Sequence, residues 1–300
     1  MKYEKQWASI DDQIELLTKV KGLEVGNVDE LRLALRNIGY YRLSAYWFPY
    51  KTIDTEGRAV FCENTSFAEI MRAYEFDRDL RLVMFDAIAE IEIYFRGRLS
   101  YLASGEDGIF GFPESVKPRL CREYYAAKKS EQFIKHFVAK YGDKHNLPPY
   151  WMMVECATMG TIELLYQKVS PSVRAEVASE LSVKVPVLKN WLSVLRVARN
   201  ACCHHSRVWN RTWGVRPVIP KDWKGFGASN GKTFAVLSVL CYLLDAIDDA
   251  APWKGRLDGL LEEYGDIDIS KLGFPESWRI MPPWCSAAGA ESQTSKSDGR

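Results

Sequence analysis

The sequence predicts an all-α fold, a bundle of helices that includes at most one small β-hairpin. Apolar residues recur at three- and four-residue spacings along most of the chain, the pattern of helices with one buried face. Pairs with the spacing of a capping box precede several of these stretches. Nothing in the pattern favours a parallel sheet, and 300 residues are ample for a sizeable core.

Two short helices and a hairpin are expected in the N-terminal part. The helices fall at about residues 10–20 and 28–38. Each follows a capping pair: Ser9 with Asp12, and Asn27 with Glu30. The aromatic block at 40–49 is interpreted as a packed helix or turn, with a functional surface around Tyr46 as the alternative. Residues 51–65 are rich in turn formers and favour a small hairpin.

The strongest helical signal runs from Phe67 to Ser104 and follows a capping box of Ser66 and Glu69. It is expected to be the spine of the bundle and, because of its length, to be bent or split. Further helices are expected over about 116–141 and 150–156, from Pro171, from near Pro186, and over 233–247.

The chain is expected to form a single helical domain over residues 1–284, within which 1–65 could form a subdomain. No internal repeat or clear linker divides it. The segment 252–284 is expected to cover an end or flank of the bundle. The last residues, 285–300, are small and polar and are predicted to be disordered.

Composition narrows the class of protein. A net charge of +1 excludes a globally basic nucleic-acid-binding chain, so any such binding would need local clustering of charge. The seven cysteines form no CxxC pair, and the N-terminus has no apolar signal-peptide core. The most apolar run, 234–244, is too short to span a bilayer. We therefore expect a reduced, cytoplasmic protein with no membrane segment.

Residues 190–211 join an apolar helix pattern to a group of polar residues, Arg199, Asn200, His204 and His205. Asn200 and His204 are four apart and would share a helix face, where the amide could select the tautomer of the imidazole. Arg199 would lie about 140° around the axis from His204, so convergence needs the helix to end or bend. Spacing alone does not choose between the two histidines.

This combination suits metal-free RNA cleavage. An imidazole can help a ribose 2′-hydroxyl attack its own phosphodiester, and a guanidinium can stabilise the charge that grows on the phosphate. The surroundings agree, because residues 196–224 hold seven basic residues and one acidic residue. The RNA-contact candidates are Arg196, Arg207, Arg211 and Trp209, with Trp213 and Trp223 as further groups that could stack on bases.

One other interpretation of the motif stays open. The arginine, asparagine and histidines could cap carbonyl groups at the helix end and tie down the following loop. A zinc site in 202–205 is disfavoured, because four consecutive residues point around a helix and cannot close a tetrahedron on one ion. We therefore predict no metal ligands.

The segment 199–204, Arg-Asn-Ala-Cys-Cys-His, resembles the R-N-x-x-x-H form of the motif found in the HEPN superfamily. More of the chain is similar to the Abi-like (abortive infection, AbiD/AbiF-type) family within it. The similar segments, in family order, are Ile38–Leu43, Tyr74–Arg81, Ile91–Ile93, Leu147–Trp151, the central motif and Gly273–Trp278. Their combination is far more specific than any one of them.

The resemblance implies a HEPN-like helical bundle with additional helices and a role in bacterial defence against phage, or a toxin-like brake on growth. It implies an endoribonuclease that uses Arg199 and His204, with Asn200 between them, and needs no metal or cofactor. HEPN nucleases usually build their site from two motifs, and one motif per chain implies a homodimer. RNA is the expected partner, with an antitoxin or a regulatory RNA as a further one. A non-catalytic RNA-binding or protein-interaction module is the alternative.

Overall fold

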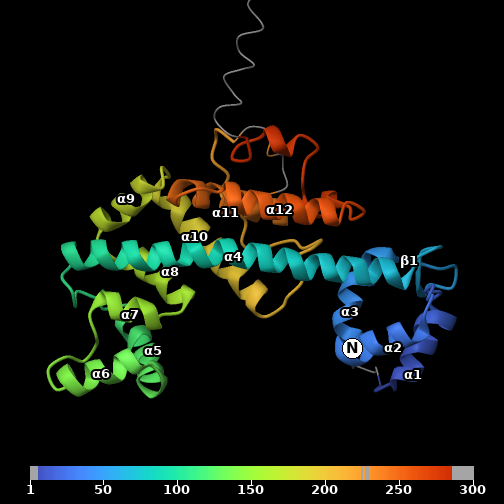
Figure 1. The fold of residues 1–300 in the computed structure, drawn as a ribbon, viewed down its shortest axis with the longest axis horizontal. Coiled ribbons are helices and arrows are strands. Elements are labelled where there is room, and N and C mark those ends of the chain that lie inside the picture. Colours follow the sequence, from blue (N-terminus) through green and yellow to red (C-terminus); the bar gives the residue numbers. More distant parts are fainter. Residues whose placement is uncertain (1–5, 224–225, 227–229, 286–300) are drawn as a thin grey trace, which may run out of the picture. The chain divides into compact units, whose positions relative to one another are not determined.

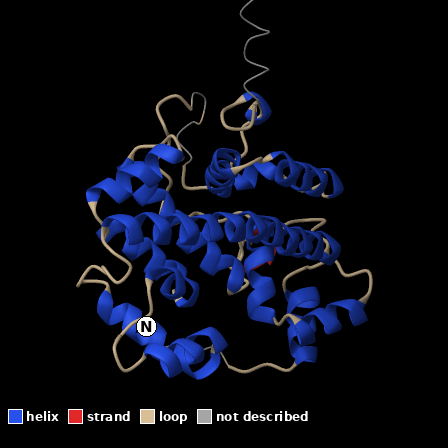
Figure 2. Ribbon diagram, turned by 60° about the vertical axis from the view of Figure 1, so that its left-hand side comes forward, coloured by secondary structure: helices blue, strands red, loops and turns tan. Residues whose placement is uncertain are grey.

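The computed structural model describes residues 6–223, 226 and 230–285. This part of the chain holds twelve α-helices and one two-stranded antiparallel sheet, and Figure 2 shows how far helix dominates. The predicted all-α class with a small hairpin is confirmed. Over the same residues, no helix combines the length and apolar character that crossing a membrane requires. The predicted disordered tail lies outside the described residues, apart from Cys285.

The chain divides into two compact units, one formed by residues up to 80 with 260–267 and the other by 81–259 with the residues from 268 onward. Helices α4 (Phe67–Glu106) and α12 (Ala251–Glu263) contribute residues to both. The motif-bearing segment belongs to the second unit.

In the first unit, α1 (Ile10–Glu15) opens with the predicted capping box. The Asp12 amide donates to Ser9 Oγ at 3.2 Å, and the Ser9 amide donates to an Asp12 carboxylate oxygen at 3.0 Å. The helix continues as a π-helical turn, Leu16–Val20, and α2 (Val28–Asn37) begins with a side-chain cap of its own. Both predicted helices are confirmed.

The aromatic block forms α3 (Tyr40–Trp47), and most of its inward face is buried. The Tyr46 hydroxyl donates to the buried Asp77 carboxylate at 2.6 Å. Tyr46 is therefore a core residue, as the packed-helix interpretation predicted. The expected hairpin consists of β1 (Lys51–Ile53) and β2 (Ala59–Phe61).

In the second unit, α4 is the spine that the sequence predicts, and it is one continuous helix rather than a split one. Figure 1 shows α11 and α12 along one side of it and α7 and α8 along the other. Side-chain hydrogen bonds fasten it on both sides. Trp253 Nε1 donates to the Val83 carbonyl at 2.9 Å, and the Arg96 guanidinium donates to the Val154 carbonyl.

Seven more helices complete this unit: α5 (Lys117–Ser130), α6 (Gln132–Tyr141), α7 (Tyr150–Cys156), α8 (Met159–Lys168), α9 (Pro171–Glu180), α10 (Val185–Cys203) and α11 (Thr233–Ile247). The region 116–141, expected as one helical stretch, is two helices. Glu131 separates them because its backbone is extended, with φ −80° and ψ 122°. After α12, the chain adds two single 3₁₀ turns, Ile269–Leu272 and Trp278–Ile280.

The core that positions the motif is built around α11, which is buried almost throughout. Aromatic rings from the C-terminal segment cover it: Phe234 stacks on Trp284 with centroids 5.8 Å apart. The Trp284 indole donates to Ser238 Oγ at 2.9 Å, which satisfies both buried groups. Helices α8, α9 and α11 all pack against α10, so the backbone that carries the motif is held firmly.

Candidate functional site

Helix α10 buries its apolar face and presents the polar motif on the opposite side. Trp191, Leu195 and Ala198 are fully buried, whereas Arg199 is half-buried and Asn200 is exposed. Pro186 lies in the first turn, where its missing N–H leaves no hydrogen bond unmade. The apolar spacing that predicted this helix therefore also determines which motif residues face outward.

The two histidines have different backbone roles at the end of α10. His204 is the C-cap residue, and its amide donates to the Asn200 carbonyl at 2.9 Å. His205 follows in the left-handed region, with φ 55°. The His205 amide donates to the Cys202 carbonyl at 3.1 Å and the Ser206 amide to the Ala201 carbonyl at 2.8 Å. This is the hydrogen-bond pattern of a Schellman cap, with His205 where glycine is usual.

Both histidine side chains are exposed, and the helix ends at His204. On a continuing helix, Arg199 and His204 would point in directions about 140° apart. Because the helix ends at His204, this restriction does not apply. Asn200 and His204 are one turn apart, as predicted. Cys202 is buried while His204 and His205 are exposed, so these neighbours do not face one point.

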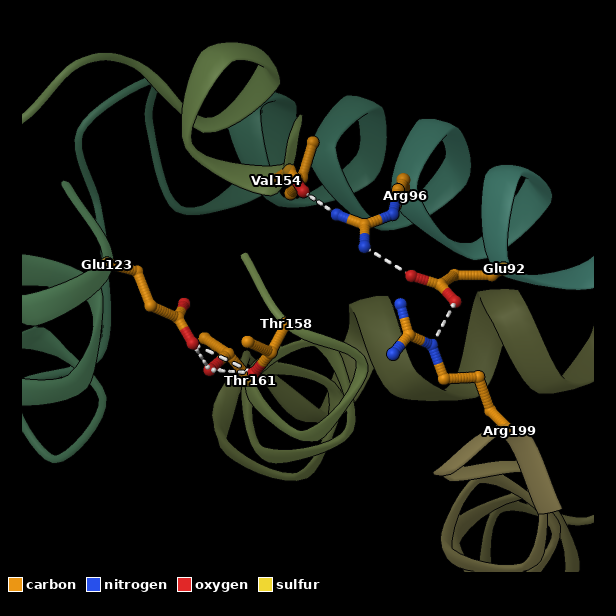
Figure 3. Close-up of polar contacts among 7 residues, drawn as sticks. All are labelled: Glu92, Arg96, Glu123, Val154, Thr158, Thr161 and Arg199. Atoms are coloured by element: carbon orange, nitrogen blue, oxygen red, sulfur yellow. Dashed lines mark hydrogen bonds and ion pairs between the residues drawn. The ribbon is translucent and has the colours of Figure 1, made fainter. Parts of the chain in front are cut away.

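Arg199 extends from α10 to α4, where its Nε lies 3.6 Å from Oε2 of Glu92 (Figure 3). The Glu92 side chain is buried. The Arg199 Nε atom is also buried and has no hydrogen-bond partner. The interaction is therefore an ion pair that orients the guanidinium, while about a third of the side chain stays in contact with solvent.

Glu92 is held in turn by Arg96, one turn further along α4 (Figure 3). The Arg96 guanidinium donates to Glu92 Oε1 and to the Val154 carbonyl at the end of α7. Arg96 is nearly as buried as Glu92. Two arginines from different helices thus share one buried carboxylate, an arrangement that fixes all three side chains.

Arg196 is held by a second buried carboxylate, that of Glu163 on α8. The Arg196 Nε donates to Glu163 Oε2, and the Ser193 hydroxyl donates to Oε1. Gln167 adds a donor to Oε1 at 3.3 Å. Like Arg199, Arg196 is anchored at Nε while part of its side chain remains exposed.

A third carboxylate, Glu123 of α5, lies at the start of α8 (Figure 3). The Thr158 and Thr161 hydroxyls donate to its Oε1 at 2.8 and 2.6 Å. Arg119, one turn earlier on α5, places its Nε 3.9 Å from the same oxygen. Each of the three carboxylates therefore pairs with a partly exposed arginine.

The predicted RNA contacts in the loop after α10 are placed differently. The Arg211 guanidinium donates to the Arg207 carbonyl at 3.1 Å and stacks on Trp213, with Cζ 4.5 Å from the ring centre. Trp209 is only 1% exposed, with Lys271 5.5 Å from its ring centre. The Arg207 guanidinium donates to the Asn210 carbonyl at 3.4 Å, so both arginines help to fasten the loop.

The prediction that Trp209, Trp213 and Trp223 stack on bases is wrong for this structure, because all three indoles are buried. Trp213 Nε1 donates to Thr233 Oγ1 at 3.1 Å, which ties the loop to α11. The alternation of tryptophan with arginine in the sequence suggested a surface for base stacking, but these indole rings fill the core.

Sequence reasoning missed Glu92, Arg96 and Glu163 as parts of the site. The sequence does contain a signal for Glu92 and Arg96. Glu92 stands four residues after the buried Ile88, on the apolar stripe of the long helix, and Arg96 follows four residues later. A carboxylate on a buried stripe needs a cationic partner. The sequence did not show that α10 would supply a second arginine, Arg199, to the same carboxylate.

Within the described residues, no group of three or more histidine, cysteine, aspartate or glutamate side chains is arranged to hold a metal ion. The chemistry available to this site is that of the side chains themselves: exposed imidazoles at the end of α10, and guanidinium groups oriented by buried carboxylates.

A family model described as Abi-like protein matches residues 33–210, which is more than half of the chain. No curated protein and no solved structure matches it in the corresponding comparisons. The matched region includes α4, α8 and α10, and therefore the carboxylate–arginine pairs and the histidines at the end of α10. The chain belongs to the Abi-like family, and this membership points to a role in abortive infection.

Proposed function

We propose that this protein is a metal-independent endoribonuclease of the HEPN type, acting in phage defence or as a toxin-like brake on growth. The observation that carries the proposal is the Arg199–Glu92 ion pair. It orients a partly exposed guanidinium on the helix that ends at the exposed His204. RNA cleavage by the 2′-hydroxyl requires a cation that stabilises the phosphate and an imidazole that takes the proton, and α10 carries one group of each kind.

In the proposed reaction, His204 takes the proton of a ribose 2′-hydroxyl as its oxygen attacks the adjacent phosphorus. The bond from phosphorus to the 5′-oxygen breaks, and that oxygen takes a proton from solvent. The products are a 2′,3′-cyclic phosphate and a 5′-hydroxyl. Arg199 stabilises the charge that builds up on the non-bridging oxygens. Glu92 is a positioning residue that acts through Arg199.

Each chain carries one motif, so we propose that two copies supply the arginine–histidine sets of a complete site. Arg196 lies one turn before Arg199 on α10 and would contact the RNA backbone. His205 remains the alternative base, although its left-handed backbone gives it a structural reason to be present at the helix end. An antitoxin or a regulatory RNA would control the activity.

One observation favours a second candidate function, a non-catalytic RNA-binding module. Arg199 and Arg196 both already have carboxylate partners, which lowers the net charge they offer to a transition state. A binder would hold RNA through the exposed parts of these side chains and would cleave nothing.

The test is cleavage of total cellular RNA by the purified protein in EDTA. Wild type is compared with His204→Ala, His205→Ala and the control His136→Ala, which removes an exposed histidine on α6. We expect His204→Ala to lose at least a hundredfold in rate while keeping its RNA affinity, because general base catalysis contributes that much.

Loss in His205→Ala alone would move the base to that residue. RNA binding without cleavage by any variant would favour the binding module. Equal cleavage by all four proteins would exclude the end of α10 as the active site.

A further inference from the structure

Three arginine–glutamate pairs, one within α5, one between α10 and α8 and one between α10 and α4, have the same layering. The guanidinium side chains of Arg119, Arg196 and Arg199 are between 35% and 40% exposed. The carboxylate side chains of their partners are only 11–14% exposed; the partners are Glu123, Glu163 and Glu92, respectively. Each pair therefore turns its positive member toward solvent and keeps its negative member beneath.

Arg119 and Arg196 come together over Gly160, in the first turn of α8. A Cβ atom on Gly160 would lie 2.7 Å from Arg119 Nη2 and 3.2 Å from Arg196 Cδ. Only a residue without a side chain lets both arginines occupy this place. Side chains of equal charge from two different helices, α5 and α10, thus meet at one point of the surface.

A third arginine, Arg199, lies further along α10. Arg196 and Arg199 are three residues apart, so they are neighbours on the helix surface. Arg119 and Arg196 meet at Gly160, and Arg199 follows Arg196 by one turn in the direction of His204. Each arginine has its Nε toward a carboxylate, at 3.9 Å for Arg119 and 3.6 Å for Arg199, and guanidinium groups paired in this way suit the paired recognition of phosphate oxygens.

We infer that Arg119 and Arg196 form a subsite for an RNA phosphate next to the one at Arg199, with Gly160 providing the space for it. The inference rests on the proposed function for the identity of the ligand as RNA. Arg119 would bind the backbone without reading the base, because guanidinium contacts to phosphate carry no sequence information. The subsite would set the path of the strand across α8 toward His204.

The experiment measures RNA binding in a His204→Ala background, which blocks the proposed cleavage, with a single-stranded RNA across a range of salt concentrations. Arg119→Ala is expected to weaken binding about fivefold at 0.1 M salt and to reduce the slope of log K against log salt by about 0.7, the loss of one phosphate contact. Arg119→Lys keeps the charge and should keep most of the slope. Arg122→Ala removes an exposed arginine from the same helix and should change neither quantity.

Gly160→Ala provides an independent test. The atom nearest the added methyl group is the end of the flexible Arg119 side chain, so the protein should fold and Arg119 should be displaced. The variant should weaken RNA binding as Arg119→Ala does. In the Arg119→Ala background it should weaken binding less than in the parent, because the closest contact is gone and only the 3.2 Å contact with Arg196 Cδ remains.

The outcomes separate this inference from the proposed function. Binding that is unchanged in Arg119→Ala, or weakened as much in Arg122→Ala, overturns the subsite and leaves RNA as the ligand. No RNA binding by the parent protein overturns the proposed function and the subsite together. Thermal unfolding of every variant is recorded, so that a loss of binding through unfolding is recognised.

Discussion

At Glu92 one buried carboxylate faces two guanidinium groups, those of Arg96 and Arg199. Burying a charge is costly unless it is paired, and here the pairing also fixes an arginine of the proposed active site. Orientation by a buried partner is how an exposed side chain becomes preorganised for an incoming charge. The residue therefore links stability to the proposed chemistry.

We predict that Glu92→Gln lowers the free energy of unfolding by about 3 kcal/mol, because the nearly buried Arg96 loses its carboxylate. Urea denaturation measures this. The matched variant Arg199→Gln leaves the Glu92–Arg96 pair intact and should cost less than about 1 kcal/mol, as expected for a partly exposed ion pair. Equal losses in the two variants would contradict the assignment of Arg96 as the main partner of Glu92.

His205 provides a second prediction at this scale. A non-glycine residue in the left-handed region costs about 1 kcal/mol, and a Schellman cap favours glycine there. His205→Gly should therefore raise the free energy of unfolding by up to about 1 kcal/mol and leave RNA cleavage intact. Measured cleavage that disappears in His205→Gly would show that the imidazole, and not the backbone, is what this position contributes.

At the scale of elements, α9 is fastened to α4 by a cluster at its last residue, Glu180. The carboxylate accepts from Arg98 Nε at 2.9 Å and from the Tyr94 hydroxyl at 2.9 Å. The hydrogen bond from Arg98 is the main cause that holds the pKa of Glu180 below its ordinary value. Burial, with the carboxylate beside it, raises the pKa of Tyr94.

This cluster predicts a pH-dependent stability. Because the pKa of Glu180 is lower in the folded protein than in the unfolded chain, it stabilises the fold at pH values above the ordinary glutamate pKa of about 4.3. That contribution is lost as the pH falls through the folded-state pKa. The difference in unfolding free energy between wild type and Glu180→Gln should be largest at neutral pH and shrink in acid. If the difference in unfolding free energy between the two proteins stays constant from pH 7 to pH 3, the lowered pKa of Glu180 does not contribute to stability.

At the scale of the whole molecule, the proposed mechanism needs two copies of the chain, because one chain supplies one motif. We predict that light scattering after gel filtration gives twice the mass of one chain. Specific cleavage activity should fall on dilution as the dimer dissociates. Full activity in a protein that stays monomeric would show that one motif is sufficient.

Much of the fold was predictable because its signals are local. Capping pairs and apolar periodicity depend on residues within one or two turns of each other, and they predicted α1, α2, α4, α10 and α11. The break at Glu131 between α5 and α6 was missed, since no glycine or proline marks it. The prediction of which residues share a helix face succeeded for the same local reason.

The sequence by itself determined the helical class, the position of the motif at the end of a helix, and the family to which the chain belongs. Only the tertiary structure decided that Glu92 faces Arg199, that Arg119 meets Arg196 over Gly160, and that Trp209 belongs to the core. Helix periodicity arises from neighbours along the chain, whereas the partner of a charge or an indole depends on which distant helix packs beside it.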